Sequence, residues 1–596
     1  MTCKRKLVVT FSVMFTLCEL ASIGRAAPIQ NPGQWVNPPF NHGVDPNNPT
    51  WDPNQAGLNS QGGKPGSNCK YNAIHAGVIP TGPNQGKVLV FGIQNEPNPT
   101  WLQFWSIVNV GPDGTDPSAT STYANYSMTL PDHKELFCSG HAWMADGRLF
   151  VAGGTAIQVG TPFDLGSDRC FIYDPVTNSW TVLSPLMARP RWYPTVTLSS
   201  DDTMMVFSGT QDSDGDCANP VDTSIDTYEA WDPSLASGAG AWQVGANGST
   251  VFAGPGSVSP PDYFRYYPRM HVLTNGRIFM SGMHIVPARL RHDKIVTMGG
   301  GYNIVSQWEV PTNNPMVGRR LYGSSFLFPG LEDVVMTSVG ADYEEACRLS
   351  DPHTGPILSS VQYAVATATP VPPTFWSAAQ SVPDETVGST TYVGARTEAN
   401  TVILPDESIL LVGGTNVDSS GNPVALRDTR RYTGQPDSGN WALMDLEDSD
   451  RGYHATSLLL PDGRVLSAGG NERDFDYQVY RPPYLVSGYS RPAVLTSPAT
   501  MQYFDANPIQ YSITYNALPP GVFLQKIVLV APGADTHHSD MAQRLVRLTM
   551  TVTDLGGTRT KFYAPRDSKH APRGYYMLFA VTNQGTPSVA RWVKLS

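Results

Sequence analysis

The chain has 596 residues, with 40 Lys and Arg against 51 Asp and Glu, so its formal net charge at pH 7 is −11. This negative charge disfavours nucleic acid and anionic membrane surfaces as partners. Charged residues make up only 15% of the sequence, whereas Gly (55) and Pro (51) are abundant. Such a composition is typical of many short strands joined by tight turns and disfavours a fold of long charged helices.

Residues 1–26 are predicted to be a secretory signal peptide, because basic residues precede an apolar stretch over residues 7–21 and small residues follow it. The apolar stretch is shorter than the ~20 residues of a membrane-spanning helix, although an uncleaved anchor is the alternative. We therefore expect a secreted, extracellular protein without a membrane span. The sequons at Asn125 and Asn247 predict a glycoprotein if the host glycosylates.

Residues 27–68 are rich in Asn, Pro and Gly, which predicts an extended segment without a core of its own. From residue 69 to residue 485 one unit recurs: an apolar strand, a tight turn, and a second apolar strand that ends in Gly-Gly or Ser-Gly. Asp-Gly and Asn-Gly turns between apolar strands are a strong hairpin signal, because both residues tolerate a positive φ. The seven copies begin at Ala76, His141, Thr195, Met270, Ser324, Asn400 and Ala455.

This repeat predicts a seven-bladed β-propeller of the kelch type, in which each copy supplies the inner strands of one blade. A stacked β-solenoid is the alternative, and it would show shorter repeats and fewer aromatic residues. The repeat stops near residue 485, and alternating segments over residues 486–596 predict a C-terminal Ig-like β-sandwich of about seven antiparallel strands. The expected fold class is therefore all-β.

The cysteine count is odd in the predicted mature chain, because Cys3 and Cys18 lie in the signal peptide. An oxidising compartment tends to pair thiols, so we expect two disulfides and one cysteine with a different role. The five remaining cysteines are Cys69, Cys138, Cys170, Cys217 and Cys347.

The residue just before each hairpin is expected at the mouth of the central channel, where the innermost strand of a blade begins. In three copies this position holds a side chain that can bind a metal or take part in redox chemistry. These are Cys138 before the second copy, Tyr193 before the third, and the pair Tyr453-His454 before the seventh. Closure of the ring brings the seventh blade near the second and third, so these residues can share one site. Taken singly, each residue has a structural explanation, because a Cys or Tyr at the end of a strand usually fills space in the hydrophobic core.

Four motifs occur along the chain: Phe137-Cys138-Ser139-Gly140, Arg191-Trp192-Tyr193, Tyr453-His454, and Thr536-His537 followed by Gln543-Arg544. With the expected fold, they resemble the copper radical oxidases, the family that contains galactose oxidase and glyoxal oxidase. The resemblance covers about residues 70–596. The Arg-Trp-Tyr motif is more similar to the glyoxal oxidase side of the family.

The resemblance implies one copper ion held by Tyr193, Tyr453, His454 and His537, with Cys138 joined to Tyr193 by a thioether. Tyr193 would then be the equatorial ligand and the radical-bearing ring, and Tyr453 the axial ligand and general base. The C-terminal sandwich would contribute His537. Imidazole and phenolate donors without a thiolate cluster suit copper better than zinc.

The implied activity is oxidation of a small aldehyde, as its hydrate, or of a primary alcohol, with reduction of O2 to H2O2. The expected partners are the small-molecule substrate, O2, and peroxidases that consume the H2O2, and we expect a monomer. His538 is the alternative to His537 as a ligand. With Cys138 in the thioether, four cysteines remain for two disulfides: Cys69, Cys170, Cys217 and Cys347.

Two departures from the family bear on the substrate. Residues 208–212 lack the aromatic that galactose oxidase places over its cross-linked tyrosine, and residues 27–68 are too short for its N-terminal carbohydrate-binding domain. Galactose is therefore disfavoured. The alternative function is a non-catalytic kelch propeller used for adhesion or carbohydrate binding. Hydrolysis in the channel would need paired carboxylates at the strand starts, and only scattered Asp residues occur there.

Overall fold

The structure is a computed structural model. It describes residues 32–36, 73–92, 102–113, 122–130, 134–156, 165–211, 225, 227–244, 252–253, 266–281, 293–298, 304–310, 322–341, 357–365, 376–470, 477–504, 507–540, 542–553 and 558–596. The predicted signal peptide, most of the segment 27–68, and the cysteines Cys69, Cys217 and Cys347 lie outside these ranges. In the described ranges the secondary structure is almost entirely β, apart from α2 (Pro483–Val486) and the 3-10 turn η3 (Ala236–Gly238). No helix in these ranges is long and apolar enough to cross a membrane.

All seven predicted hairpins are confirmed, and each forms the inner part of an antiparallel sheet of at least four strands. The first three sheets follow one another in the chain. The first contains β2 (His75–Val78), β3 (Val88–Phe91), β4 (Leu102–Asn109) and β5 (Thr122–Thr129). The second contains β6 (Lys134–Trp143), β7 (Leu149–Ala156), β8 (Leu165–Gly166), β9 (Cys170–Asp174) and β10 (Ser179–Val182). The third contains β11 (Thr195–Leu198), β12 (Met204–Phe207), β13 (Thr227–Asp232), β14 (Ala241–Trp242) and β15 (Phe252–Ala253).

The remaining four sheets of this part have four strands each in the described residues. The fourth contains β16 (Arg269–Val272), β17 (Ile278–Ser281), β18 (Asp293–Met298) and β19 (Ile304–Val310). The fifth contains β20 (Ser325–Leu327), β21 (Val334–Thr337), β24 (Gln362–Val365) and β25 (Ser377–Ala378). The sixth contains β28 (Asn400–Ile403), β29 (Ile409–Val412), β32 (Asp428–Thr433) and β33 (Asn440–Leu446). The seventh contains β34 (Ala455–Leu459), β35 (Val465–Gly469), β36 (Tyr477–Arg481) and β1 (Gln34–Val36).

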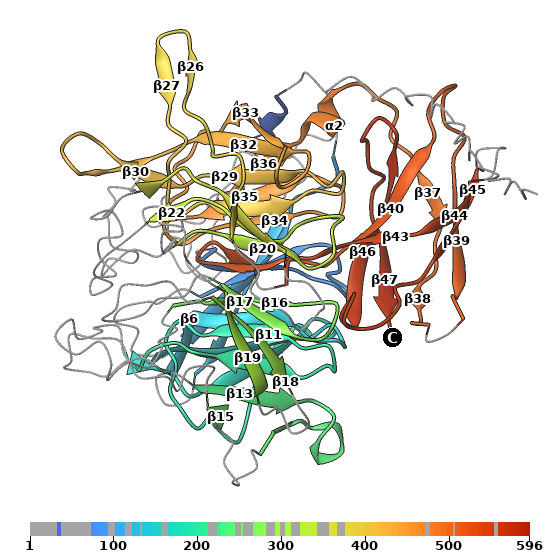
Figure 1. Ribbon diagram of the computed structural model, residues 1–596. Coiled ribbons are helices and arrows are strands. Elements are labelled where there is room, and N and C mark those ends of the chain that lie inside the picture. Colours follow the sequence, from blue (N-terminus) through green and yellow to red (C-terminus); the bar gives the residue numbers. More distant parts are fainter. Residues whose placement is uncertain are drawn as a thin grey trace, which may run out of the picture.

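The inner strands of neighbouring sheets lie beside one another, as in the pairs β6 and β11, β11 and β16, β16 and β20, and β28 and β34. The seventh sheet also meets the first, because β34 lies beside β2. Smaller hairpins extend from this framework, and two of them project at the upper left of Figure 1. These smaller hairpins are β22 (Gly340–Ala341) with β23 (Ile357–Leu358), β26 (Glu385–Val387) with β27 (Thr390–Tyr392), and β30 (Thr415–Val417) with β31 (Pro423–Ala425).

The seventh sheet receives its outermost strand from the N-terminal end of the chain. Strand β1 pairs antiparallel with β36, opposite residues about 440 positions later in the sequence. Trp35 in β1 is buried, its backbone N–H donates to Asp445 Oδ2 (2.9 Å), and its indole N–H donates to Thr429 Oγ1 (3.1 Å). The segment expected only to be extended therefore completes a sheet in its described part.

The C-terminal domain is a sandwich of two sheets, coloured orange to red in Figure 1. One sheet contains β37 (Val494–Thr496), β39 (Gln510–Tyr515), β45 (Arg559–Tyr563) and β44 (Met550–Thr553). The other contains β38 (Thr500–Met501), β47 (Arg591–Leu595), β46 (Gly574–Thr582), β40 (Leu524–Val530) and β43 (Leu545–Leu548). The two sheets contain nine strands in the described residues, more than the predicted number of about seven. One reason is that the segment 545–553 crosses between the sheets and forms both β43 and β44.

A hairpin of the C-terminal domain enters the N-terminal sheets. It consists of β41 (Ala534–Thr536) and β42 (Ser539–Asp540), and β41 pairs antiparallel with β2. The carbonyl of Gly533 accepts hydrogen bonds from Val78 N (3.0 Å) and from the indole of Trp143 (3.1 Å). The carboxylate of Asp535 accepts from Ser457 N (2.7 Å). The first, second and seventh sheets thus each bind this hairpin through a hydrogen bond.

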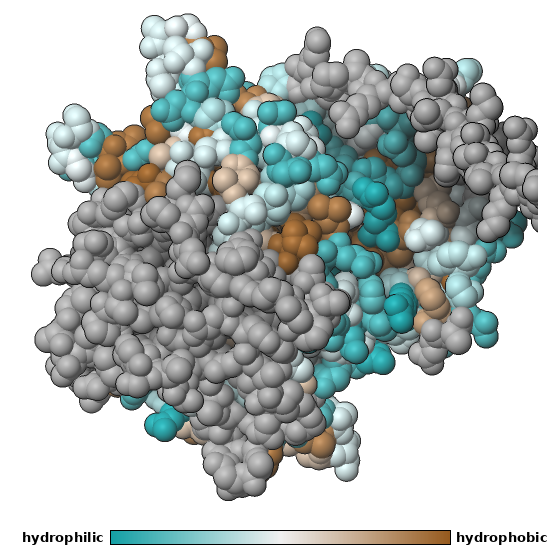
Figure 2. All heavy atoms as spheres, viewed as in Figure 1, coloured by the Kyte–Doolittle hydropathy of each residue, from teal (hydrophilic) through white to brown (hydrophobic). Residues whose placement is uncertain are grey.

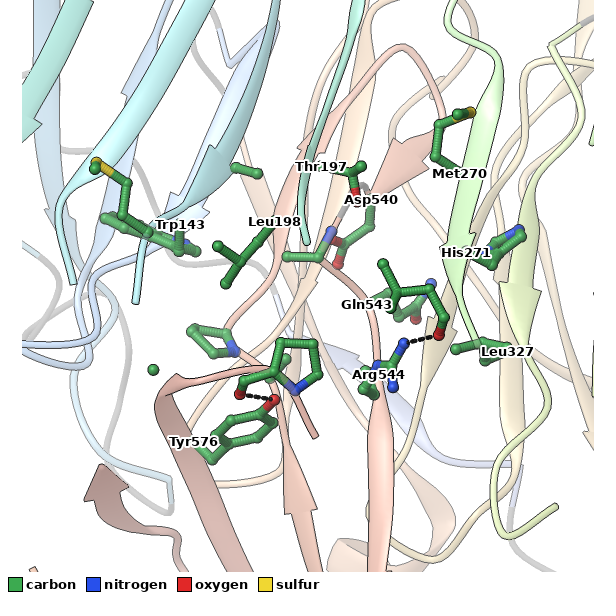
Figure 3. Close-up of a pocket in the computed structure, with 18 of the residues that line it drawn as sticks. Trp143, Thr197, Leu198, Met270, His271, Leu327, Asp540, Gln543, Arg544 and Tyr576 are labelled. Carbon is green, nitrogen blue, oxygen red and sulfur yellow. Dashed lines mark hydrogen bonds between the residues drawn. The ribbon is translucent and has the colours of Figure 1, made fainter. Parts of the chain in front are cut away.

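A cavity of about 90 Å³ lies between the hairpin, the ends of the inner strands and the C-terminal domain (Figure 3). The side chain of Gln543 bridges the sixth sheet, since it accepts from Ile403 N (2.6 Å) and donates to Thr401 O (3.1 Å). Arg544 donates to the carbonyl of Val272 in the fourth sheet. The Gln-Arg motif therefore docks the C-terminal domain, a role that its sequence position did not indicate.

Candidate metal centre

One unusual backbone conformation recurs where the inner strands begin. Six sheets present a non-glycine residue with positive φ at this place: five lie just before the inner strand, and Cys138 lies at the register shift inside β6. The hairpin from the C-terminal domain adds a seventh, His537 (φ 47°). Such residues are uncommon and cluster at functional sites. The six are Cys138 (φ 63°), Tyr193 (φ 59°), Tyr267 (φ 42°), Tyr322 (φ 51°), Glu398 (φ 58°) and His454 (φ 67°).

Backbone hydrogen bonds link these positions from sheet to sheet. Tyr193 N donates to Cys138 O, and Tyr267 N donates to Tyr193 O, both at 3.0 Å. Glu398 N donates to Tyr322 O, also at 3.0 Å. The left-handed conformation therefore recurs in six of these sheets, and backbone hydrogen bonds connect several of its positions in neighbouring sheets.

Buried arginines anchor three of these chain segments. Arg191, two residues before Tyr193, donates to the carbonyls of Ser208 (2.7 Å) and Thr227 (3.0 Å) and pairs with Glu229 at 3.0 Å. Both side chains of this ion pair are fully buried.

The sixth and seventh sheets repeat this arrangement. Arg396 donates to Gly413 O (3.1 Å) and pairs with Asp428 (2.7 Å), and Arg451 donates to Gly469 O (3.0 Å). Each guanidinium ties a strand-start segment to the second inner strand, or its end, in the same sheet, which holds the strained residue in place.

The structure brings together the five residues that the sequence singled out. Cys138, His454 and His537 each offer one ligand atom, and these three atoms lie within 4.8 Å of one another. The phenol oxygens of Tyr193 and Tyr453 are hydrogen-bonded to each other. The rings of His454 and His537 are 4.6 Å apart and perpendicular (89°), and the ring of Tyr193 is 4.6 Å from His537. Two imidazoles, two phenols and a thiol therefore converge on one point.

The protonation of these groups suits a cation site. Burial raises the pKa of Tyr193 well above its usual value, and Cys138 and Tyr453 raise it further. Burial also raises the pKa of Tyr453 and lowers that of His537, so without a cation the phenols stay protonated and the imidazole neutral. A neutral imidazole is the form that binds metals, and His537 Nε2 is buried without a hydrogen-bond partner among the described residues. The donor set fits a copper ion, which prefers imidazole and oxygen ligands in tetragonal geometry.

Three other histidines of this region, His75, His141 and His538, lie outside the group of converging ligand atoms. His538, the alternative ligand, is not part of the group of three ligand atoms formed by Cys138, His454 and His537. His75 and His141 are fully buried, with rings 5.2 Å apart, and the ring of His75 is 5.9 Å from His537. Burial lowers the pKa of His141 to about 3. These neutral rings pack beside the ring of His537.

Two aromatic rings cover Tyr193, although residues 208–212 supply none. Trp192 stacks on Tyr193 with ring centroids 3.7 Å apart and planes at 8°, and Tyr267 stacks at 4.7 Å and 29°. Tyr322 packs edge-on against Tyr453, with centroids 5.2 Å apart. The sequence interpretation missed Tyr267, Tyr322 and Glu398. All three occupy the strand-start position in the fourth, fifth and sixth copies, but no motif distinguishes them from packing residues.

Cys170 does not form the disulfide that was expected for it. Its thiol is free and fully buried, and it packs between the second and third sheets with Phe150, Val206 and Trp231. Burial raises the pKa of this thiol well above its usual value, which makes it an apolar filler. Three cysteines therefore remain for disulfide formation, and all three lie outside the described residues: Cys69, Cys217 and Cys347.

The chain is similar in sequence to several known oxidases. Residues 491–595 match the model of the galactose oxidase-like, Early set domain. A galactose oxidase of Gibberella zeae is 24% identical over 511 residues, which cover 81% of this chain and 63% of that protein. The aldehyde oxidase GLOX of Vitis pseudoreticulata is 33% identical over 214 residues, covering 33% of this chain and 40% of that protein. These matches thus span less than two thirds of either relative.

Among solved structures, the fold is similar to that of a fungal alcohol oxidase of the AA5 family determined in complex with copper. The TM-score is 0.65 at 20% identity, and the alignment covers 88% of this chain and 98% of the other. This likeness supports the propeller-like arrangement of the four-stranded sheets and the C-terminal domain.

Proposed function

This chain belongs to the galactose oxidase and glyoxal (aldehyde) oxidase family of copper radical oxidases, and from this premise we propose that it oxidises a small aldehyde hydrate or a primary alcohol and reduces O2 to H2O2. The observation that carries the proposal is the convergence of the Cys138, His454 and His537 ligand atoms beside the paired phenols of Tyr193 and Tyr453. A glyoxal oxidase-like activity is part of the proposal, since the Arg191-Trp192-Tyr193 motif resembles the glyoxal oxidase side of the family.

In the proposed site, His454, His537, Tyr193 and Tyr453 would hold one copper ion, which would supply one-electron redox chemistry and a position for the substrate oxygen. Tyr453, the phenol of the set with a partly exposed side chain, would lose its proton on binding copper and, as the phenolate, accept the hydroxyl proton of the substrate. The oxygen of Tyr193, joined through its ring to Cys138 Sγ and oxidised by one electron, would accept the hydrogen atom from the substrate carbon, and the copper would take up the second electron. Trp192 and Tyr267 cover that ring and exclude water from it.

The proposal also includes the domain organisation and the location of the protein. The seven sheets form one closed kelch-type propeller over residues 69–485, and residues 486–596 form the Ig-like sandwich that contributes His537. Residues 1–26 act as a signal peptide, so that the mature protein is an extracellular, monomeric glycoprotein with one disulfide between two of the cysteines Cys69, Cys217 and Cys347. Peroxidases are then the natural consumers of the H2O2.

The test is a peptide map of the metal-free protein before and after exposure to copper and oxygen. We expect copper and O2 to join the peptides that contain Cys138 and Tyr193, with loss of two hydrogen atoms, and H2O2 to form with small aldehydes or alcohols. Tyr453→Phe should keep the cross-link but lower kcat/KM about 10²–10⁴-fold, the usual contribution of a general base.

Cys138→Ser is the matched control, because it keeps the size of the side chain and removes the sulfur. It should bind copper without forming a joined peptide. Separate peptides in the native protein after copper treatment, together with no H2O2, would leave the adhesion or carbohydrate-binding alternative as the better account.

A further inference from the structure

The hydroxyl of Thr536 makes two hydrogen bonds at the junction of the two domains. Thr536 Oγ1 lies 2.9 Å from the carbonyl oxygen of Ile74, just before β2, and 2.7 Å from Nδ1 of His537. All three residues are buried, with exposures of 0% for Thr536, 1% for His537 and 5% for Ile74. No solvent therefore competes for these bonds.

Counting hydrogen atoms fixes the direction of both bonds. A threonine hydroxyl carries one hydrogen, and a backbone carbonyl only accepts. The hydrogen between Thr536 and Ile74 must therefore come from Thr536, which leaves its oxygen as the acceptor for His537. The phenol of Tyr267 is a third polar neighbour of the Thr536 hydroxyl. Because Tyr267 donates its one hydrogen to Ser139 O (2.9 Å), it adds no donor to Thr536. His537 Nδ1 consequently carries the proton.

The tautomer decides which nitrogen of His537 is available to a metal. With the proton on Nδ1, the lone pair lies on Nε2, which is buried without a hydrogen-bond partner among the described residues. The opposite tautomer would place an N–H there and set two lone pairs against each other at Thr536. Metal-binding histidines usually have their second nitrogen fixed by such a donor or acceptor.

We propose that Thr536 is a positioning residue that locks His537 in the Nδ1–H tautomer and aims Nε2 at the copper centre. The inference rests on the proposed function for the identity of the metal. Because Ile74 precedes the first propeller strand and Thr536 belongs to the C-terminal domain, the relay from Ile74 through Thr536 to His537 also sets the ligand in register with the propeller. The ladder between β2 and β41, in which His75 lies opposite Thr536, supports the same register.

The first test uses metal-free protein labelled with ¹⁵N in histidine, with the His537 signals assigned from a His537→Gln variant. We expect the Nδ1–H tautomer in the native protein and in Thr536→Ser, which keeps the hydroxyl. Thr536→Val keeps the shape and removes the hydroxyl, so it should show a mixture of tautomers or Nε2–H. A native protein with Nε2–H, or a valine variant with unchanged tautomer, overturns the inference whether or not copper binds.

The second test measures Cu(II) affinity by competition with a chelator, and electron spin echo modulation of the bound Cu(II), which reports the remote imidazole nitrogen. Thr536→Val should weaken affinity about 10–100-fold and alter the remote-nitrogen signal, whereas Thr536→Ser should resemble the native protein. An equal affinity and signal in the valine variant would refute the positioning role. Absence of copper binding by the native protein would instead refute the proposed function, and the tautomer would still be decided by the first test.

Discussion

The indole of Trp192 lies parallel to the phenol ring of Tyr193, with centroids 3.7 Å apart and planes at 8°. Tyr267 also lies near parallel to Tyr193, at 4.7 Å and 29°, so that Tyr193 is held between two π systems. An electron-rich ring face attracts positive charge. The two rings therefore stabilise an electron-deficient Tyr193 relative to the neutral phenol.

Replacing Trp192 by Leu is expected to raise the one-electron potential of Tyr193. Loss of a stacked pair removes about 0.5–1.5 kcal/mol, which corresponds to about 20–65 mV for a one-electron couple. A spectroelectrochemical titration of copper-loaded protein measures this shift. Trp192→Phe retains a ring and should shift the potential less, and a Leu variant with the native potential would show that stacking has no effect on the radical.

The inner hairpins were predictable because their determinants are local. At the turn after β34, Gly463 has φ of 86°, and the Asp462 carboxylate accepts from Arg464 N (3.1 Å), so the Asp-Gly pair specifies the hairpin by itself. The pairing of β1 with β36 was not predictable in this way. It depends on contacts made by Trp35 with residues about 400 positions away, which leave no periodic pattern in the sequence.

The sequence predicted the residues of the centre that belong to a recognisable motif at a strand start. The prediction missed those strand-start residues that are a phenol or a carboxylate without a motif. Tyr267 and Tyr322 occupy the same position as Tyr193, but without a motif their chemistry is indistinguishable from packing. Cys170 was misjudged for a related reason. An odd cysteine count shows that one thiol is spare, yet only packing between sheets identifies a second unpaired thiol.

Trp35→Ala is expected to weaken the seventh sheet. Truncation of a buried tryptophan typically costs about 3–5 kcal/mol of unfolding free energy, and here it also removes the indole bond to Thr429. Urea unfolding monitored by circular dichroism measures the loss. Gln34→Ala is the matched control, since Gln34 is exposed in the same strand. Equal stability of the two variants would mean that β1 does not support the sheet.

The buried pair Arg191–Glu229 should be far more sensitive to truncation than an exposed pair. Glu229→Ala leaves a buried guanidinium without its counterion, which is expected to cost about 3–5 kcal/mol. Asp450→Ala removes the exposed partner of Arg427, 2.6 Å away, and should cost at most about 1 kcal/mol. Chemical denaturation of both variants gives the comparison. Similar losses would contradict the anchoring role assigned to Arg191.

Asp540 should make stability depend on pH in a defined direction. Burial raises the pKa of this carboxyl from 3.8 to about 6, although its oxygen accepts from Ala534 N and Ala542 N, both at 3.0 Å. Since the folded pKa is above the unfolded one, the folded state holds the proton more tightly. The stabilising contribution is complete below pH about 4 and is lost as the pH rises through about 6.

Asp540→Asn removes this titration and retains an amide oxygen that accepts the same two backbone bonds. At about 1.4 kcal/mol for each pKa unit, the free energy of unfolding of the variant, relative to the native protein, should rise by about 2–3 kcal/mol between pH 4 and pH 7 and then level off. Urea midpoints of the metal-free proteins at several pH values measure this difference. A difference that stays constant across that range would show that Asp540 titrates near its ordinary pKa, so that the cavity of Figure 3 does not desolvate it.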